Sequence, residues 1–307
     1  MTNNAAIMIC GDASQDGAEP QAFQLLADTL SKNLEGHYVT FGLLGSDGHS
    51  IHKGLEDLKS LGVTKIVCLP GMLFTPADVK SALPNAINDF DISNPEIDVT
   101  LGKDLGIDPK MLLAAQARVL EAMPDTVSMG DTVLMIVGAG ACDAEANAHV
   151  AKMARLLLEG MGFAWSEVCY SGEVFPSVGQ AIKQTVKLPY KQILVLPYFL
   201  CAGRAVEGIY ADVDKAAASY PEHTFIKVQP LSVQQHLIET MVERVHQALE
   251  GGDTNAMNCQ LCTFREQVLG QEVGYDHTHE HDHNHDHGHS HSHDHTHSHD
   301  PDGPAER

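Results

Sequence analysis

The runs KIVCLPGMLF at residues 65–74 and KQILVLPYFL at residues 191–200 decide the fold. Each is a short, almost continuous apolar run, which is typical of a strand buried on both faces of a parallel sheet. The two runs fall into register when 127 is added to the residue number, so that Pro70 corresponds to Pro197. A constant offset between similar segments indicates an internal repeat.

The repeat extends along the chain on both sides of these runs. The same offset relates further pairs of identical residues: Ile9 and Ile136, Gly11 and Gly138, Gly45 and Gly172, Leu73 and Leu200, and Val79 and Val206. Equal spacing at so many positions is hard to produce by chance. The sequence therefore predicts two tandem copies of one domain, at residues 1–127 and 128–252, followed by a segment of different character at residues 253–307.

Within each copy, apolar runs alternate with amphipathic runs of helical period. Strands are predicted at residues 5–10, 37–44, 65–74, 96–102, 132–138, 165–172, 191–200 and 224–231. Helices are predicted at residues 20–34, 52–62, 78–90, 109–123, 144–162, 205–220 and 234–252. Because strands that alternate with helices form βαβ units, we expect an α/β fold with two parallel sheets, helices on both faces of each sheet, and a cleft between the domains.

The composition narrows the possible functions. The chain has 307 residues, 43% of them apolar, which is enough to bury a sizeable core. Its formal charge of -22 argues against binding to nucleic acid or to an anionic membrane, since both need a basic surface. No run approaches the ~18 apolar residues of a membrane span, and the N-terminus lacks the pattern of a signal peptide. The seven cysteines fit reduced thiols in a cytoplasmic protein better than a disulfide framework.

Two aspartates follow strands at the edge of the sheet where open α/β folds bind ligands. Asp12 follows the first strand and Asp78 follows the third, in loops at residues 11–19 and 74–80. Because the carboxyl ends of parallel strands meet at one edge, the two carboxylates could together bind a divalent cation or accept protons. An Asp in such a loop is more often a helix cap or a turn residue, and the pattern alone leaves that alternative open.

The segment after residue 252 is rich in metal-binding side chains. Cys259 and Cys262 form a C-x-x-C pair in a polar segment, where they make half of a four-ligand metal site or, alternatively, a reactive dithiol. Alternating histidines follow, which favours binding of nickel, cobalt or zinc. They are His277, His279, His281, His283, His285, His287, His289, His291, His293, His295, His297 and His299. With almost no apolar residues after Tyr275, this tail is expected to be disordered without metal.

The paired repeats, LPYFL at residues 196–200, and MNCQLC at residues 257–262 with a His-rich tail resemble the class II chelatases. The resemblance is to the long CbiX-type sirohydrochlorin cobaltochelatases of cobalamin biosynthesis, and it spans nearly the whole chain. It implies two α/β domains that insert a divalent metal, usually Co2+ with Ni2+ as another option, into a sirohydrochlorin-type tetrapyrrole without ATP. It also places a [4Fe-4S] cluster on Cys259 and Cys262, which a homodimer could share.

The chain departs from the family at two positions. The family carries one histidine in a G-H-G-S motif and another in a G-H-V-K-N-D-I-P motif. The matching stretches here are GDAS at residues 11–14 and ADVKSALP at residues 77–84, so Asp12 and Asp78 stand where the histidines would be. Ser14 matches the serine of the first motif. The resemblance thus implies that the two aspartates hold the metal and accept the pyrrole protons.

The replacement of imidazoles by carboxylates, which are weaker bases and harder ligands, leaves several functions open. In the first, the protein is a cobaltochelatase in which Lys80 and Arg204 contact the carboxylates of the macrocycle. In the second, it is a non-catalytic accessory protein that binds cobalt, nickel or the tetrapyrrole and delivers cobalt to a separate chelatase. In a third, it is an iron–sulfur redox protein on a vestigial chelatase body, which depends on Cys259 and Cys262.

Overall fold

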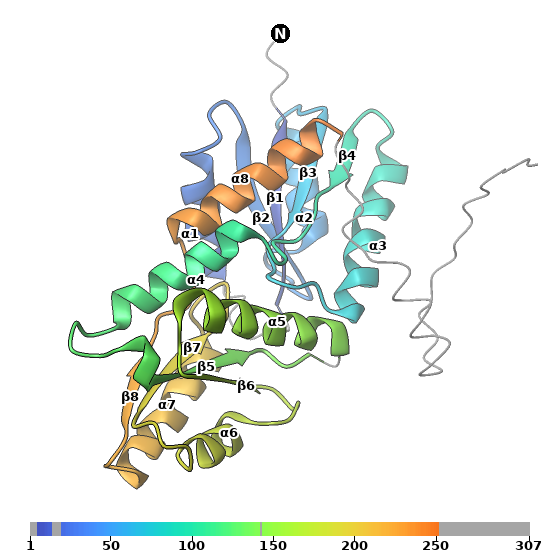
Figure 1. Cartoon of the computed structure of the whole chain (residues 1–307). Coiled ribbons are helices and arrows are strands. Elements are labelled where there is room, and N and C mark those ends of the chain that lie inside the picture. The colour runs from blue at the N-terminus through green and yellow to red at the C-terminus, as the bar shows by residue number, and fades with distance from the viewer. Residues whose placement is uncertain (1–4, 14–19, 142, 252–307) are drawn as a thin grey trace, which may run out of the picture. The chain divides into compact units, whose positions relative to one another are not determined.

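The computed structural model describes residues 5–13, 20–141 and 143–251. These residues form two four-stranded parallel sheets, one in each half of the chain, within one compact unit (Figure 1). The strand order is β2-β1-β3-β4 in the first sheet and β6-β5-β7-β8 in the second. The predicted α/β class and the internal repeat are therefore confirmed by two sheets of the same topology.

The first half contains four strands and four helices. Its strands are β1 (Ala6–Asp12), β2 (Tyr38–Leu44), β3 (Lys65–Pro70) and β4 (Asp98–Leu101). Its helices are α1 (Pro20–Ser31), α2 (Ile51–Ser60), α3 (Ala77–Ser93) and α4 (Pro109–Ala122). Each of these elements corresponds to one that the sequence predicts. The strand predicted at residues 65–74 ends early, at Pro70, because the following residues leave the sheet and form the loop that leads to α3.

The second half repeats this order. Its strands are β5 (Thr132–Gly138), β6 (Trp165–Tyr170), β7 (Gln192–Pro197) and β8 (Thr224–Lys227). Its helices are α5 (Ala144–Met161), α6 (Val178–Thr185), α7 (Arg204–Ser219) and α8 (Gln235–Leu249), with a short 3-10 turn at Met129–Asp131 before β5. No helix in the described part of the chain is long and apolar enough to cross a membrane.

Helix α6 is absent from the prediction. It is only eight residues long, which is too short for helical periodicity to stand out. Its start carries a reciprocal capping box, in which the amide of Gln180 donates to Ser177 Oγ and the amide of Ser177 donates to Gln180 Oε1. The Ser-x-x-Gln spacing is the sequence signal that locates this helix.

The central strands β1 and β5 are buried along their whole length, as their apolar runs predict. Because successive side chains point to opposite faces of a sheet, each strand contributes to two cores. Ile7 and Ile9 of β1 lie in the same core as Leu134 and Ile136 of β5. The alternate residues of each strand lie in a separate core beneath the outer helices of their own half. The two halves therefore share one apolar core.

The last helix returns to the first half of the chain. Helix α8 contacts β3, β4, α1 and α4, which all belong to the first half, as Figure 1 also shows. Arg244 on α8 donates hydrogen bonds to the backbone oxygens of Asp104 at 3.0 Å and Leu105 at 3.2 Å. Periodicity predicts that α8 is a helix but not which sheet it covers. The domain boundaries at residues 127 and 252 remain predictions.

Candidate active site

A cavity of about 600 Å³ lies between the two halves, at the carboxyl ends of the strands. Its lining residues come from the ends of β1 and the loop after β3 in the first half, and from the segments after β5, β6 and β7 in the second. This is the edge of an open α/β sheet at which ligands bind. The cavity is the cleft that the sequence predicts.

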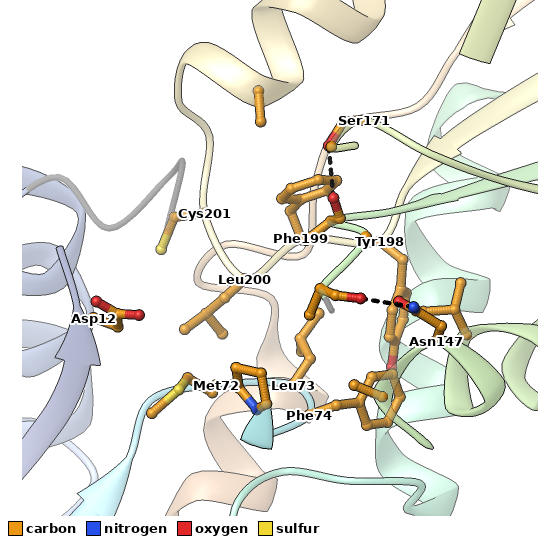
Figure 2. Close-up of a pocket in the computed structure, with 18 of the residues that line it drawn as sticks. Asp12, Met72, Leu73, Phe74, Asn147, Ser171, Tyr198, Phe199, Leu200 and Cys201 are labelled. Carbon is orange, nitrogen blue, oxygen red and sulfur yellow. Dashed lines mark hydrogen bonds between the residues drawn. The ribbon is translucent and has the colours of Figure 1, made fainter. Parts of the chain in front are cut away.

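Two opposing wall segments are related by the internal repeat. Residues 72–74 line one side and residues 199–201, their counterparts in the second half, line another (Figure 2). Among the described lining residues the ionisable side chains are Asp12, Asp78, Tyr198 and Cys201, and there is no Lys, Arg or His. The cavity therefore combines broad apolar walls with two carboxylates.

The two predicted aspartates line this same cavity. Asp12 is the last residue of β1 and is only 7% exposed, at one end of the cavity in Figure 2. Asp78 is exposed and lies in the first turn of α3, where the helix dipole favours a negative charge. The N-cap position of α3 is occupied by Pro76, so Asp78 is not the cap that the alternative interpretation suggested.

Carboxylates are among the side chains that bind divalent cations in proteins. In the stretches that the structure describes, no three His, Cys, Asp or Glu side chains lie together in a way that could hold a metal ion. A divalent cation held by Asp12 and Asp78 would therefore keep coordination positions for water or for a ligand in the cavity.

The two predicted contacts to substrate carboxylates do not line the cavity in the described structure. Lys80 is 8% exposed, and its Nζ lies 2.9 Å from Glu145 Oε2 and 3.9 Å from Asp143 Oδ2. Arg204 is exposed at the start of α7, next to Ala205, which does line the cavity. A role of either side chain in substrate binding remains a prediction.

Several predicted site residues lie outside the described part of the chain. Ser14 falls in the undescribed residues 14–19. Cys259, Cys262 and the histidines of the tail fall in residues 252–307. Their assignments to substrate, cluster and metal remain predictions.

Tyr198 and Cys201 line the cavity but are not predicted as site residues. They follow β7 in an apolar stretch that predicts one continuous buried strand. The sequence pattern therefore gives no sign of the turn that brings the two residues to the cavity. Burial raises the pKa of Cys201 to about 12 and also raises the pKa of Tyr198. Both side chains are therefore protonated near neutral pH. The Leu-Pro at the end of β7, repeated from β3, is the signal that could have placed this loop.

Replacing Tyr198 by phenylalanine is expected to raise the free energy of unfolding by about 1 kcal/mol. The hydroxyl is buried and has no hydrogen-bond partner within the described residues, so its removal relieves a desolvation cost. The matched control is Tyr210→Phe, because the Tyr210 hydroxyl donates to Val228 O at 2.6 Å. That variant is expected to lose about 1 kcal/mol. Urea unfolding of both variants checks the pair, and a loss of stability in Tyr198→Phe would contradict the expectation.

Asp104, a carboxyl that does not line the cavity, predicts a pH dependence of stability. Burial raises the pKa of Asp104, against the opposing effects of two hydrogen bonds from Thr75 and the charges of Lys80 and His149. A raised pKa in the folded state means that the folded protein binds the proton more tightly, so stability from Asp104 is lost as the pH rises above its ordinary value of about 4.

Asp104→Asn is expected to remove this dependence while keeping an oxygen acceptor for Thr75. The unfolding free energy of the variant, relative to the intact chain, should therefore increase as the pH rises from about 4 towards neutrality. Urea unfolding at a series of pH values measures this difference. A difference that stays constant or falls with rising pH would be evidence against the raised pKa.

A comparison with protein families identifies the fold. The family model described as CbiX matches residues 6–122 and 133–248, which are most of the two halves. The chain belongs to the CbiX family. This CbiX-family chain is 28% identical over 217 residues to the sirohydrochlorin cobaltochelatase of Priestia megaterium, and the alignment covers 70% of each protein. It is 25% identical over 213 residues to a sirohydrochlorin ferrochelatase of the same organism, covering 69% of this chain and 79% of the relative.

Solved structures share the fold of this CbiX chain. SirB from Bacillus subtilis with Fe3+ has a TM-score of 0.69 and 21% sequence identity, covering 81% of this chain and 98% of that one. The sirohydrochlorin chelatase SirB from Bacillus subtilis subspecies spizizenii in complex with cobalt has a TM-score of 0.63 and 21% identity, covering 81% and 96%. At these identities the likeness shows the fold alone.

Proposed function

We propose that this CbiX-family protein inserts Co2+ into sirohydrochlorin or a closely related tetrapyrrole in the cavity between its halves. The observation that carries the proposal is the position of Asp12 and Asp78, which replace the two histidines of the family motifs and line one cavity with mostly apolar walls. The similarity to a sirohydrochlorin cobaltochelatase and a sirohydrochlorin ferrochelatase supports the substrate.

The apolar lining of the cavity suits the faces of a tetrapyrrole ring. Residues 72–74 and 199–201 offer apolar surfaces from the two halves, and the cavity volume of about 600 Å³ accommodates the centre of a macrocycle. Burial of the ring faces against these walls supplies binding energy without hydrogen bonds. The ring's carboxylates would then extend towards the rim, where Arg204 is exposed at the start of α7.

Metal insertion exchanges two pyrrole N–H protons for bonds between the metal and the ring nitrogens. In the proposed reaction Asp12 and Asp78 hold the cation through carboxylate oxygens while the ring nitrogens approach it. Cobalt prefers nitrogen ligands to carboxylate oxygens, so transfer to the ring is favourable. As the metal leaves, each carboxylate can accept one pyrrole proton and pass it to water.

The rival function is an accessory protein that binds cobalt, nickel or the tetrapyrrole without turnover. The replacement of imidazoles by carboxylates favours the accessory function, because carboxylates are weaker bases. The lack of a three-residue ligand group in the described residues favours it as well. The two functions differ in turnover. An enzyme forms more metallated product than there are protein chains, whereas a carrier retains the metal.

Cobalt is the metal for which the fastest insertion is expected. Both a cobaltochelatase and a ferrochelatase are among the relatives, so the metal needs a direct comparison. Anaerobic absorption spectroscopy of sirohydrochlorin with Co2+, Fe2+ or Ni2+ gives the three initial rates, each corrected for its protein-free reaction. A faster corrected rate with Fe2+ would replace the cobaltochelatase proposal by a ferrochelatase.

Three further parts of the proposal stay predictions. They are the [4Fe-4S] cluster on Cys259 and Cys262, a homodimer that shares it, and a location in the cytoplasm.

A further inference from the structure

Asp78 is carried by a short segment that leads from β3 into α3. The segment is anchored before Asp78 at Thr75, whose amide and hydroxyl both donate to Asp104 Oδ2 at 2.9 Å. The backbone oxygen of Asp104 in turn accepts a hydrogen bond from Arg244 of α8 at 3.0 Å. The first end of the segment is thus tied to the loop between β4 and α4.

The segment is anchored after Asp78 at Lys80. Lys80 is buried on α3 and pairs across the two halves with Glu145, at 2.9 Å between Nζ and Oε2. Asp143 Oδ2 lies 3.9 Å from the same Nζ, and its other oxygen accepts from the amides of Glu145 and Ala146 at the start of α5. The second end of the segment is thus tied to the other half of the protein.

Asp78 lies between these two anchors, three residues after Thr75 and two before Lys80. Its own side chain is exposed, so its position in the cavity depends on the backbone that carries it. We propose that Asp104 and Glu145 are positioning residues that hold the Asp78 carboxylate in the cavity, Asp104 through Thr75 and Glu145 through Lys80. This inference rests on the proposed function, in which Asp78 acts on the metal.

The physical reason is the sensitivity of catalysis to geometry. A displacement of about 1 Å at a reacting group can cost about 100-fold in rate. Both anchors use an acidic side chain in a part-buried hydrogen bond, and such bonds are stronger than those at the surface. The anchor at Glu145 comes from the second half, so the relative position of the halves sets the position of Asp78.

The test combines amide hydrogen exchange with kinetics in the full-length protein. The variants are Glu145→Gln, which removes the charge at constant size, and Asp104→Ala, which removes the acceptor of Thr75. Exchange of the amides of Thr75 and Lys80, which donate to Asp104 and to Pro76 O, is expected to rise about tenfold. The amides of β5 should keep their protection, which shows that the fold is intact.

In the same variants kcat for cobalt insertion is expected to fall about tenfold with little change in KM for sirohydrochlorin, because the apolar walls are untouched. Asp104→Asn retains an oxygen acceptor for Thr75. Its amide exchange and its kcat should therefore lie closer to the values of the intact chain than to those of Asp104→Ala. The matched control is Glu243→Gln. It removes the ion pair between Glu243 of α8 and Lys110 of α4, in which Oε2 and Nζ lie 2.5 Å apart. It is expected to leave the exchange of residues 75–80 and kcat unchanged.

Unchanged exchange of residues 75–80 in both variants would overturn the inference, and so would faster exchange with an unchanged kcat. If the intact protein shows no turnover, the proposed function fails. The exchange measurement then still decides whether Asp104 and Glu145 hold the segment that carries Asp78.

Discussion

Replacing Asp12 and Asp78 together by alanine is expected to lower the rate of cobalt insertion about 100-fold or more, to the rate of the protein-free reaction. The two side chains are the carboxylates among the described residues that line the cavity, and in the proposed mechanism they are both the metal ligands and the proton acceptors. Their loss leaves the apolar walls intact, so the tetrapyrrole should still bind. Anaerobic absorption spectroscopy of the reaction measures the rate.

The control for this double variant is Asp89→Ala. Asp89 is an exposed carboxylate on the same helix as Asp78, and it does not line the cavity. This variant is expected to react at the rate of the intact chain. A double variant that also keeps the intact rate would remove Asp12 and Asp78 from the mechanism.

Replacing Lys80 by methionine is expected to lower the free energy of unfolding by about 3 kcal/mol or more. The side chains of Lys80 and Asp143 are 10% and 1% exposed, and that of Glu145 is 18% exposed. Without the lysine, two carboxylates with little access to water lose their common cation, and removing one partner of a buried ion pair is costly. Urea unfolding measures the loss.

The control for Lys80 is Lys215→Met. Lys215 pairs with Asp212 at 2.9 Å, but the two side chains are 76% and 45% exposed. An exposed pair of this kind contributes less than about 1 kcal/mol. The double variant Lys80→Met/Glu145→Gln should be more stable than Lys80→Met alone, because one of the two carboxylates is then replaced by a neutral amide. Equal losses for Lys80→Met and Lys215→Met would show that the Lys80 pair is not a buried one.

The fold of this chain can be predicted from its sequence because apolar periodicity and the internal repeat can both be detected without knowing the tertiary contacts. The runs at residues 65–74 and 191–200 each contain the strand that their composition predicts, although the strands end at Pro70 and Pro197. The offset of 127 maps β3 onto β7 residue by residue. What periodicity does not carry is the partner of an element. The packing of α8 against the first half depends on contacts such as the hydrogen bond from Arg244 to the backbone oxygen of Asp104. Such a contact between distant residues cannot be predicted from the spacing of apolar residues.

The candidate site is predicted in part for the same reason. Asp12 and Asp78 are found because the carboxyl end of each strand can be located, and the structure brings both to one cavity. Lys80 looks like a substrate contact in the sequence, whereas the fold pairs it with Glu145, 65 residues away. Tyr198 and Cys201 are missed because their apolar neighbours make the loop after β7 look like part of the strand.

The measurement that tests the central claim most directly is a product count with the intact protein. Sirohydrochlorin in excess, Co2+ at several times the protein concentration and the full-length chain are mixed anaerobically, and the cobalt product is followed by absorption against a protein-free reaction. The proposed function predicts faster product formation than in the protein-free reaction, and more than one product molecule per chain. A rate at or below the protein-free reaction, with the cobalt retained by the protein, would contradict it and would make this CbiX-family protein a metal carrier.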